Sequence, residues 1–460
     1  MGTITLSPSR TIARWISDCS GTWSDTDLHG ARRAFHDTAA CMLAGAGDAA
    51  VNNVHAAVAV WGTGECTVVG TPNRLSAPWA ALVNGTAAHA LDFDDVLEIG
   101  AAHASAALVP ALLALGEERN ASVAACLDAY LVGFEVLARL SEAMNMTHYF
   151  RGWHTTLSLG APAVAAACAR LLQLDEKRTL AAISLATSSS SGFKRQFGTM
   201  AKPVHAGLAA KSGLLAASMA AAGVTAAEDI FEGQDGFVAL FAGTKPSRLE
   251  MSVARIGKPS AMEQYGIWQK FYPCCASLHR PLDALLQLRL EQDLLPGDLI
   301  SIEVVVSEVA AQNLPYQRPA NAMQARFSLP YTLASAFVDG QLAITAFGSN
   351  AIKRQMVDAL LPLITMQTDA TQAGTAIAGK VRERAAVNIH LRDGRTLSRE
   401  VVDPRGHPRT PLTKREMDEK FVDCASRSLS TDTARMALAC LNGLDSISDM
   451  RVLAEALRTH

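Results

Sequence analysis

Apolar residues recur at helical spacing over much of the chain, from about residue 30 to residue 240. This stretch is rich in alanine, leucine and glycine, and clusters of glycine, asparagine and aspartate interrupt it, as at 45–48 and 70–73. Apolar residues three and four positions apart predict amphipathic helices, and many small residues predict close helix–helix packing. Thr155 and Thr156 can cap a helix that reaches about Leu172. Pro203 suits the first turn of another helix that reaches Gly223.

The pattern changes after about residue 268. Residues 301–309 (SIEVVVSEV) and 387–391 (VNIHL) are rich in β-branched residues, and Asp393-Gly394 between alternating segments predicts a hairpin. A helix between these strands is expected to end at Asp339-Gly340, where glycine can adopt the left-handed conformation. A final helical segment is expected to begin near Thr413.

These patterns predict a mainly α fold with an α+β insertion. The helical domain is expected over residues 1–268, the smaller α+β domain over 269–412, and the return of the helical domain over 413–460. At 460 residues, the chain is long enough to bury a large core.

Composition excludes several classes of function. Residues of the apolar set make up 49% of the chain and charged residues 18%, with a formal net charge of -3, so no global basic field points to nucleic acid. No apolar stretch reaches the length of a membrane span, and the start has no signal-peptide pattern, so we expect a cytoplasmic protein. The nine cysteines are scattered apart from Cys274-Cys275, so we expect neither a disulfide framework nor a zinc or iron–sulfur site.

The segment His89-Ala-Leu-Asp92-Phe-Asp94-Asp95, followed by His103, carries the strongest chemical signal. Carboxylates and imidazoles in an apolar stretch need hydrogen bonds, ion pairs or a pocket. A histidine beside carboxylates can transfer protons. The alternative is a helix N-cap next to a core histidine whose hydrogen bonds are satisfied.

Three further segments contain candidate residues. His154 directly precedes a predicted helix start, where free N–H groups favour a carboxylate. Lys202 precedes the helix-opening Pro203, and Lys194 and Arg195 lie upstream as further candidates for binding a substrate anion. The alternatives are a structural histidine and solvated cations. The third segment, 271–280, lies where the pattern changes, and a domain junction is a favoured place for a ligand pocket.

The sequence resembles the MmgE/PrpD family, which includes 2-methylcitrate dehydratase and cis-aconitate decarboxylase. The resemblance covers residues 10–455 and rests on five ordered segments, AAHALDFDDV, YFRGWHTT, FGTMAKPVHAG, YPCCASLHRP and ARFSLPYTLASAFVDG. It implies an all-helical domain, an α+β lid domain and a homodimer. It also implies catalysis without a metal or an organic cofactor.

Transferred by position, the family site implies a pocket between the two domains, formed by Asp92, His103, His154, Lys202, His279 and Tyr331. Arg280 is a further candidate for binding a substrate carboxylate. Many relatives continue DFDD with threonine, whereas this chain has Val96. An isopropyl group in place of a hydroxyl implies that the substrate turns a less polar group towards this position.

The expected chemistry is proton transfer next to a carboxylate of a small di- or tricarboxylate. His103 is the expected proton-transfer group, with Asp92 orienting its imidazole. Dehydration of the 2-methylcitrate type is the first hypothesis because it is common in the family. The alternatives are decarboxylation of the cis-aconitate type, epimerisation of an iminodisuccinate-like dicarboxylate, and a catalytically silent carboxylate-binding protein.

Overall fold

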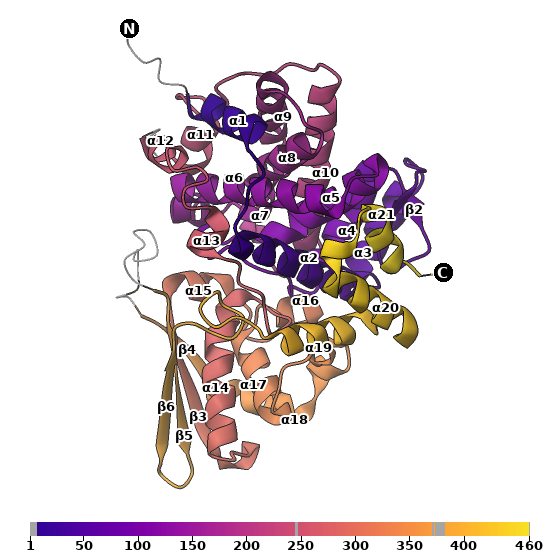
Figure 1. The fold of residues 1–460 in the computed structure, drawn as a ribbon. Helices are drawn as coiled ribbons and strands as arrows, with labels where there is room; N and C mark the ends of the chain where they lie inside the picture. Colours follow the sequence, from indigo (N-terminus) through magenta and orange to yellow (C-terminus); the bar gives the residue numbers. More distant parts are fainter. Residues whose placement is uncertain (1–6, 244–246, 370–371, 373–381, 460) are drawn as a thin grey trace.

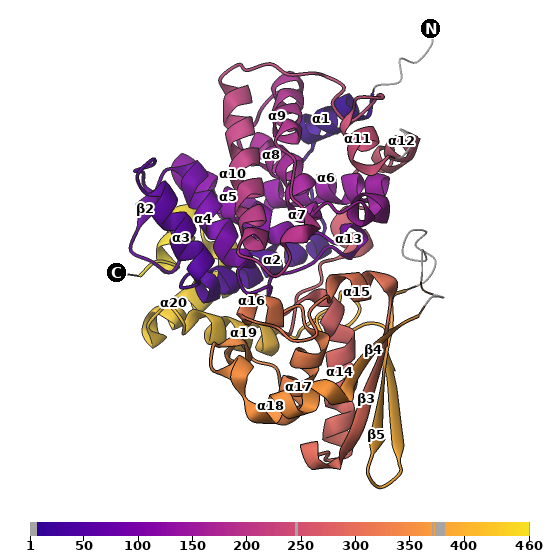
Figure 2. The same cartoon turned by 180° about the vertical axis from the view of Figure 1, so that it is seen from behind.

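The computed structural model describes residues 7–243, 247–369, 372 and 382–459. A large helical part and a smaller α+β part lie one above the other, as Figures 1 and 2 show from opposite sides. The helical part contains α1 Pro8–Asp18, α2 Asp25–Gly45, α3 Ala49–Val58, α4 Ala77–His89, α5 Ala104–Arg119, α6 Val123–Phe150, α7 Thr155–Ser158, α8 Gly160–Leu171, α9 Glu176–Ser188, α10 Ala201–Ala221, α11 Phe237–Ala242, α12 Ser247–Val253 and α13 Ala261–Tyr265, with a short ribbon of β1 Cys66–Thr67 and β2 Arg74–Leu75.

The α+β part has a four-stranded mixed sheet with its own apolar core. Its strands are β3 Leu299–Val306, β4 Ile364–Thr368, β5 Ala385–Leu391 and β6 Thr396–Val401, in the order β4-β3-β5-β6. Within the described residues of this sheet, β3 and β4 pair in parallel and the other neighbouring strands pair antiparallel. The helices of this part are α14 His279–Glu291, α15 Glu308–Asn313, α16 Ala322–Ala325, α17 Leu329–Asp339 and α18 Gln355–Leu360. Helices α14 and α17 pack against the sheet.

The chain then returns to the helical part through α19 Lys414–Ala425, α20 Thr431–Asn442 and α21 Met450–Ala456. Thr413 and Glu416 form a reciprocal capping box at the start of α19, which satisfies free N–H groups of the first turn. Helix α19 packs against α2. It therefore lies at the boundary between the two parts, as Figure 1 shows.

The structure confirms the mainly α fold with an α+β part. The hairpin expected at Asp393-Gly394 joins β5 to β6, and α17 ends at Gly340 with a φ of 70°. The helix expected from Thr155 to about Leu172 is instead divided into α7 and α8. Pro162 cannot donate an N–H to the carbonyl of Ser158, and that carbonyl accepts a hydrogen bond from Ser190 Oγ at 2.7 Å.

Small residues bring α4 and α10 into close contact. A Cβ on Gly207 would lie 2.1 Å from the carbonyl oxygen of Leu82, and one on Gly85 would lie 2.7 Å from the Cα of Gly207. The helices approach at glycines because any side chain there would clash with backbone. No helix in the described ranges is both long and apolar enough to cross a membrane.

We expect Gly207→Ala to destabilise the fold because its methyl group would push α10 away from α4. Overpacking of this kind costs about 1 to 3 kcal/mol, which thermal unfolding followed by circular dichroism would detect as a lower Tm. Gly47→Ala is the control, since a Cβ there meets nothing within 4 Å. An unchanged Tm in Gly207→Ala would contradict the proposed close approach.

Candidate active site

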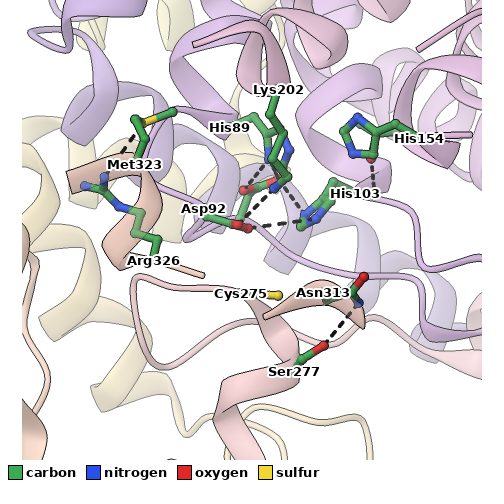
Figure 3. Close-up of polar contacts among 12 residues, drawn as sticks. His89, Asp92, His103, His154, Lys202, Cys275, Ser277, Asn313, Met323 and Arg326 are labelled. Carbon is green, nitrogen blue, oxygen red and sulfur yellow. Dashed lines mark hydrogen bonds and ion pairs between the residues drawn. The ribbon is translucent and has the colours of Figure 1, made fainter. Parts of the chain in front are cut away.

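A cavity of about 670 Å³ lies between the helical and the α+β parts. This volume lies within the range of small-molecule sites. Asp92, His103, His154 and Lys202 line it from the helical part, and Cys275, Ser277, Asn313 and Phe327 line it from the other side. Figure 3 shows Cys275, Ser277 and Asn313 opposite the Asp92–His103 group.

Asp92 lies in the turn that follows α4 and adopts a left-handed conformation with a φ of 52°. Its carboxylate is buried and ion-paired with two ammonium groups: Lys202 Nζ lies 2.9 Å from Oδ2, and Lys270 Nζ contacts Oδ1. Lys270 Nζ also donates to the backbone carbonyl of Asp92 at 2.7 Å. Burial alone would raise the pKa of Asp92, but the charges of Lys202 and Lys270 lower it well below its usual value.

Asp94, and not Asp92, is the carboxylate closest to the His103 ring. His103 Nδ1 lies 3.0 Å from Asp94 Oδ2, whereas His103 Nε2 lies 3.9 Å from Asp92 Oδ1. The expectation that Asp92 orients the imidazole is therefore corrected, because lysines pair with both Asp92 oxygens. Asp94 also contacts His89 Nδ1 at 2.9 Å. Burial lowers the pKa of His103 more than Asp94 raises it. The His103 imidazole is therefore neutral at neutral pH when no substrate is bound.

The motif around His154 positions the His103 loop. Thr156 Oγ1 accepts a hydrogen bond from the backbone N–H of His103 at 3.1 Å, and Thr155 Oγ1 donates to the carbonyl of Ala101 at 2.7 Å. His154 Nδ1 lies 2.9 Å from His205 Nδ1. Its other ring nitrogen is buried and has no protein partner within the described part of the chain, so it is available to a bound molecule.

The opposite wall of the cavity is polar. Tyr149 donates its hydroxyl to Asn313 Oδ1 at 2.8 Å, and Asn313 Nδ2 donates to Ser277 Oγ at 3.2 Å. The Ser277 hydroxyl hydrogen is thereby left for another acceptor. This wall and the Asp92–His103 group could bind opposite ends of one small polar molecule.

Arg280 lines the cavity but is already neutralised. Its guanidinium pairs with Glu98 at 2.6 Å and with Glu383 at 3.0 Å, and it donates to the carbonyl of Val402 at 2.8 Å. A substrate carboxylate would have to compete with both glutamates. The structure therefore assigns Arg280 to contacts between the two parts, since Glu98 lies in the helical part. Val96 also lines the cavity, as expected.

Four predicted site residues do not line the cavity: His279, Tyr331, Lys194 and Arg195. His279 is buried between backbone groups, with its ring nitrogens 3.3 Å from Tyr272 N and 3.3 Å from the Cys275 carbonyl. The Tyr331 hydroxyl donates to the carbonyl of Ala346. These contacts leave neither side chain directed at the cavity.

The two upstream cations also lie elsewhere. Lys194 Nζ lies 3.6 Å from the ring centre of Tyr149, and burial lowers its pKa to about 8. Arg195 is exposed. Lys194 therefore contacts the ring of a cavity-lining tyrosine, and Arg195 faces solvent.

Sequence reasoning missed Lys270 and the role of Asp94. Lys270 directly precedes segment 271–280, and its only signal in the sequence is a lone lysine between aromatic residues. Asp94 belongs to the acidic segment 92–95, but spacing along the chain does not show which carboxylate lies beside His103. Backbone geometry decides this, because the left-handed Asp92 turns its side chain towards the lysines.

His89, Asp92, Asp94 and His103 bring four metal-ligand atoms within 4.8 Å of one another. A divalent cation would need carboxylate oxygens that are free to bind it. Lys202 and Lys270 occupy the Asp92 carboxylate. The donor set therefore fits a divalent cation poorly.

The whole chain resembles known proteins. The MmgE/PrpD N-terminal domain matches residues 10–250, and the MmgE/PrpD C-terminal domain matches residues 272–445. The chain is 31% identical over 408 residues to cis-aconitate decarboxylase of Homo sapiens, covering 85% of this chain and 82% of that protein. It is 27% identical over 472 residues to cis-aconitate decarboxylase of Aspergillus terreus, covering 97% and 95%. The two domain matches and these relatives show that the chain belongs to the MmgE/PrpD family and is an enzyme of the lyase class.

Proposed function

We propose that this lyase decarboxylates cis-aconitate or a close polycarboxylate analogue, with His103 as the proton-transfer group. The observation that carries the proposal is the His103–Asp94 pair beside Asp92 and Lys202 in a cavity of suitable size. The relatives named above support decarboxylation over the dehydration expected first. Water loss from 2-methylcitrate is the alternative outcome of the same experiments.

The charged side chains at the inner end of the cavity balance one another before a substrate binds. Asp92 and Asp94 are balanced by Lys202 and Lys270, and the imidazoles of His89 and His103 are neutral because burial lowers the pKa of each. A polycarboxylate that enters adds negative charge that nothing there yet balances. Its field favours protonation of a neighbouring imidazole, so binding prepares His103 to donate a proton.

The substrate has defined partners in the cavity. Lys202 has further ammonium hydrogens besides the one directed at Asp92, and His154 Nε2 lacks a protein partner within the described residues. Ser277 can donate its hydroxyl from the opposite wall. These groups hold carboxylates while the reacting carbons lie beside His103.

The reaction balances with one proton. The bond from a CH₂ carbon to its carboxylate breaks, and its electron pair forms a new double bond to the neighbouring carbon. The electrons of the original double bond move to the far alkene carbon, which takes a proton from the His103 imidazolium. Carbon dioxide leaves, the product is a five-carbon unsaturated diacid, and solvent returns the proton to His103.

The first test is turnover of cis-aconitate, 2-methylcitrate and iminodisuccinate, with products identified by NMR. We expect carbon dioxide and the five-carbon diacid from cis-aconitate, and a loss of about 100- to 10,000-fold in His103→Ala. His55→Ala is the control, since His55 does not line the cavity. Water loss from 2-methylcitrate alone would refute decarboxylation, and binding without turnover would indicate a carboxylate-binding protein.

The pH dependence distinguishes the two reactions. The pKa of His103 lies below its usual 6.5 because of burial. If His103 donates a proton, kcat/KM falls about tenfold per pH unit as pH rises above that pKa. If neutral His103 removes a proton, as in dehydration, kcat/KM falls as pH drops below that pKa. We expect the first profile, after correction for the ionisation of the substrate.

Asp94→Asn tests which carboxylate orients His103. An amide cannot stabilise the imidazolium as a carboxylate does, so we expect kcat to fall about 100-fold or more with little change in KM. The comparison variant is Asp95→Asn, because Asp95 is as deeply buried as Asp94 but accepts a hydrogen bond from the backbone N–H of Ser105 at 3.2 Å instead of pairing with His103. Equal losses in both variants would refute a specific role for Asp94.

Val96→Thr tests which group of the substrate faces Val96 in the cavity. A threonine hydroxyl would supply a hydrogen bond worth about 1 to 3 kcal/mol to a substrate carboxylate left without one. We expect kcat/KM to rise about 5- to 150-fold for the tricarboxylate that gains this bond. Val309→Thr is the matched control, since Val309 also lines the cavity. No gain in Val96→Thr would mean that Val96 serves packing alone.

A further inference from the structure

Lys420 is a buried cation on α19 that does not line the cavity. Its ammonium group donates to the backbone carbonyls of Phe93 and Lys270, each at 2.9 Å. It also pairs with Asp37 Oδ1 at 2.7 Å and lies 3.8 Å from the ring centre of Phe93. The buried ammonium group therefore makes two hydrogen bonds to backbone carbonyls and one ion pair.

These two carbonyls belong to the segments that supply the ion pair at Asp92. Phe93 directly follows Asp92, and Lys270 sends its own Nζ back to the carbonyl and the carboxylate of Asp92. Two lysines thus join these segments. Lys420 binds a backbone carbonyl of each, and the Lys270 side chain binds Asp92 beside the cavity. Asp37 adds α2 to the same group.

The backbone at Asp92 needs such support. Its φ of 52° is left-handed, a conformation that a residue with a Cβ keeps only when its surroundings enforce it. The carbonyl of Asp92 accepts from Lys270, and the next carbonyl, that of Phe93, accepts from Lys420. Two lysines therefore bind consecutive carbonyls of the turn that aims the Asp92 carboxylate.

We propose that Lys420 is a positioning residue for the active site: from outside the cavity it holds the Asp92 turn against the Lys270 segment, so that Asp92 stays paired beside His103. Helix α19, with which the chain returns to the helical part, thereby contributes to the geometry of the site. An apolar side chain of the same length would leave both carbonyls unbound. Only the Val96–Trp268 backbone pair and the Lys270 side chain, among the contacts of the described residues, would then still join the two segments, so we expect the Asp92 turn and Lys270 to shift relative to His103.

Two variants separate this role from simple stability. Lys420→Met removes the carbonyl contacts but also leaves the buried Asp37 carboxylate unpaired. The double variant Asp37→Asn/Lys420→Met leaves no buried unpaired charge and still lacks the carbonyl contacts. Asp37→Asn alone is the matched control, because it keeps the Lys420 ammonium group and both carbonyls.

The kinetic part of the test rests on the proposed function. We expect Tm of the double variant to return to near that of the wild type, while its kcat on cis-aconitate stays about 100-fold lower with little change in KM, as expected from a misplacement of about 1 Å. Asp37→Asn should retain most of the wild-type kcat. A double variant with wild-type kcat would refute the positioning role.

A second readout needs no substrate. Lys270 is one of the charges that lower the pKa of His103; Lys202 acts in the same direction, Asp94 opposes them, and Asp92, His89 and His154 are the other ionisable groups nearby. Displacement of Lys270 should raise the His103 pKa in the double variant and not in Asp37→Asn. Titration of ¹³C-labelled histidine by NMR, with His103 assigned through His103→Gln, measures this. If the wild type turns over none of the acids, the proposed function fails, yet this titration still decides the role of Lys420: an unchanged His103 pKa would refute it.

Discussion

The buried carboxylate of Asp92, held between two ammonium groups, is the constraint on which the site depends. A buried charge is costly unless it is paired and hydrogen-bonded. Lys202 comes from the first turn of α10, and Lys270 comes from the segment that enters the α+β part. The turn after α4, the start of α10 and this segment must therefore meet at one point.

Close packing of α4 and α10 helps to bring these segments together. Helix α10 can deliver Lys202 to the turn after α4 because glycines allow the two helices to approach closely. The small residues along α10 thus act as a packing surface, and their consequence for the site is indirect. A larger residue at Gly207 would move the helix that carries Lys202, so catalytic geometry and core packing are coupled here.

Electrostatics at this site are local. The net charge of the chain, -3, provides no long-range attraction for an anionic substrate. The charges of Asp92 and Asp94 are instead balanced by Lys202 and Lys270 beside neutral imidazoles. Arg280, which sequence reasoning assigned to the substrate, is paired with Glu98 and Glu383. Its charge therefore connects the two parts of the protein around the cavity.

The sequence by itself determined the fold class, the change from helices to an α+β part, and individual signals such as the Asp393-Gly394 hairpin and the helix start near Thr413. These depend on local periodicity and turn chemistry, which neighbouring residues specify. It also identified Asp92, His103, His154 and Lys202, which the structure brings to one cavity.

Only the tertiary structure decided which groups meet. Asp94 lies 3.0 Å from His103 because the left-handed Asp92 directs its own carboxylate to Lys202 and Lys270. Lys420, 150 residues beyond Lys270 in the chain, binds the same turn from behind. His279 and Tyr331 turn instead to backbone carbonyls and amides. The partner of each of these side chains depends on competition among donors and acceptors that are distant in sequence. Spacing along the chain carries no information about that competition.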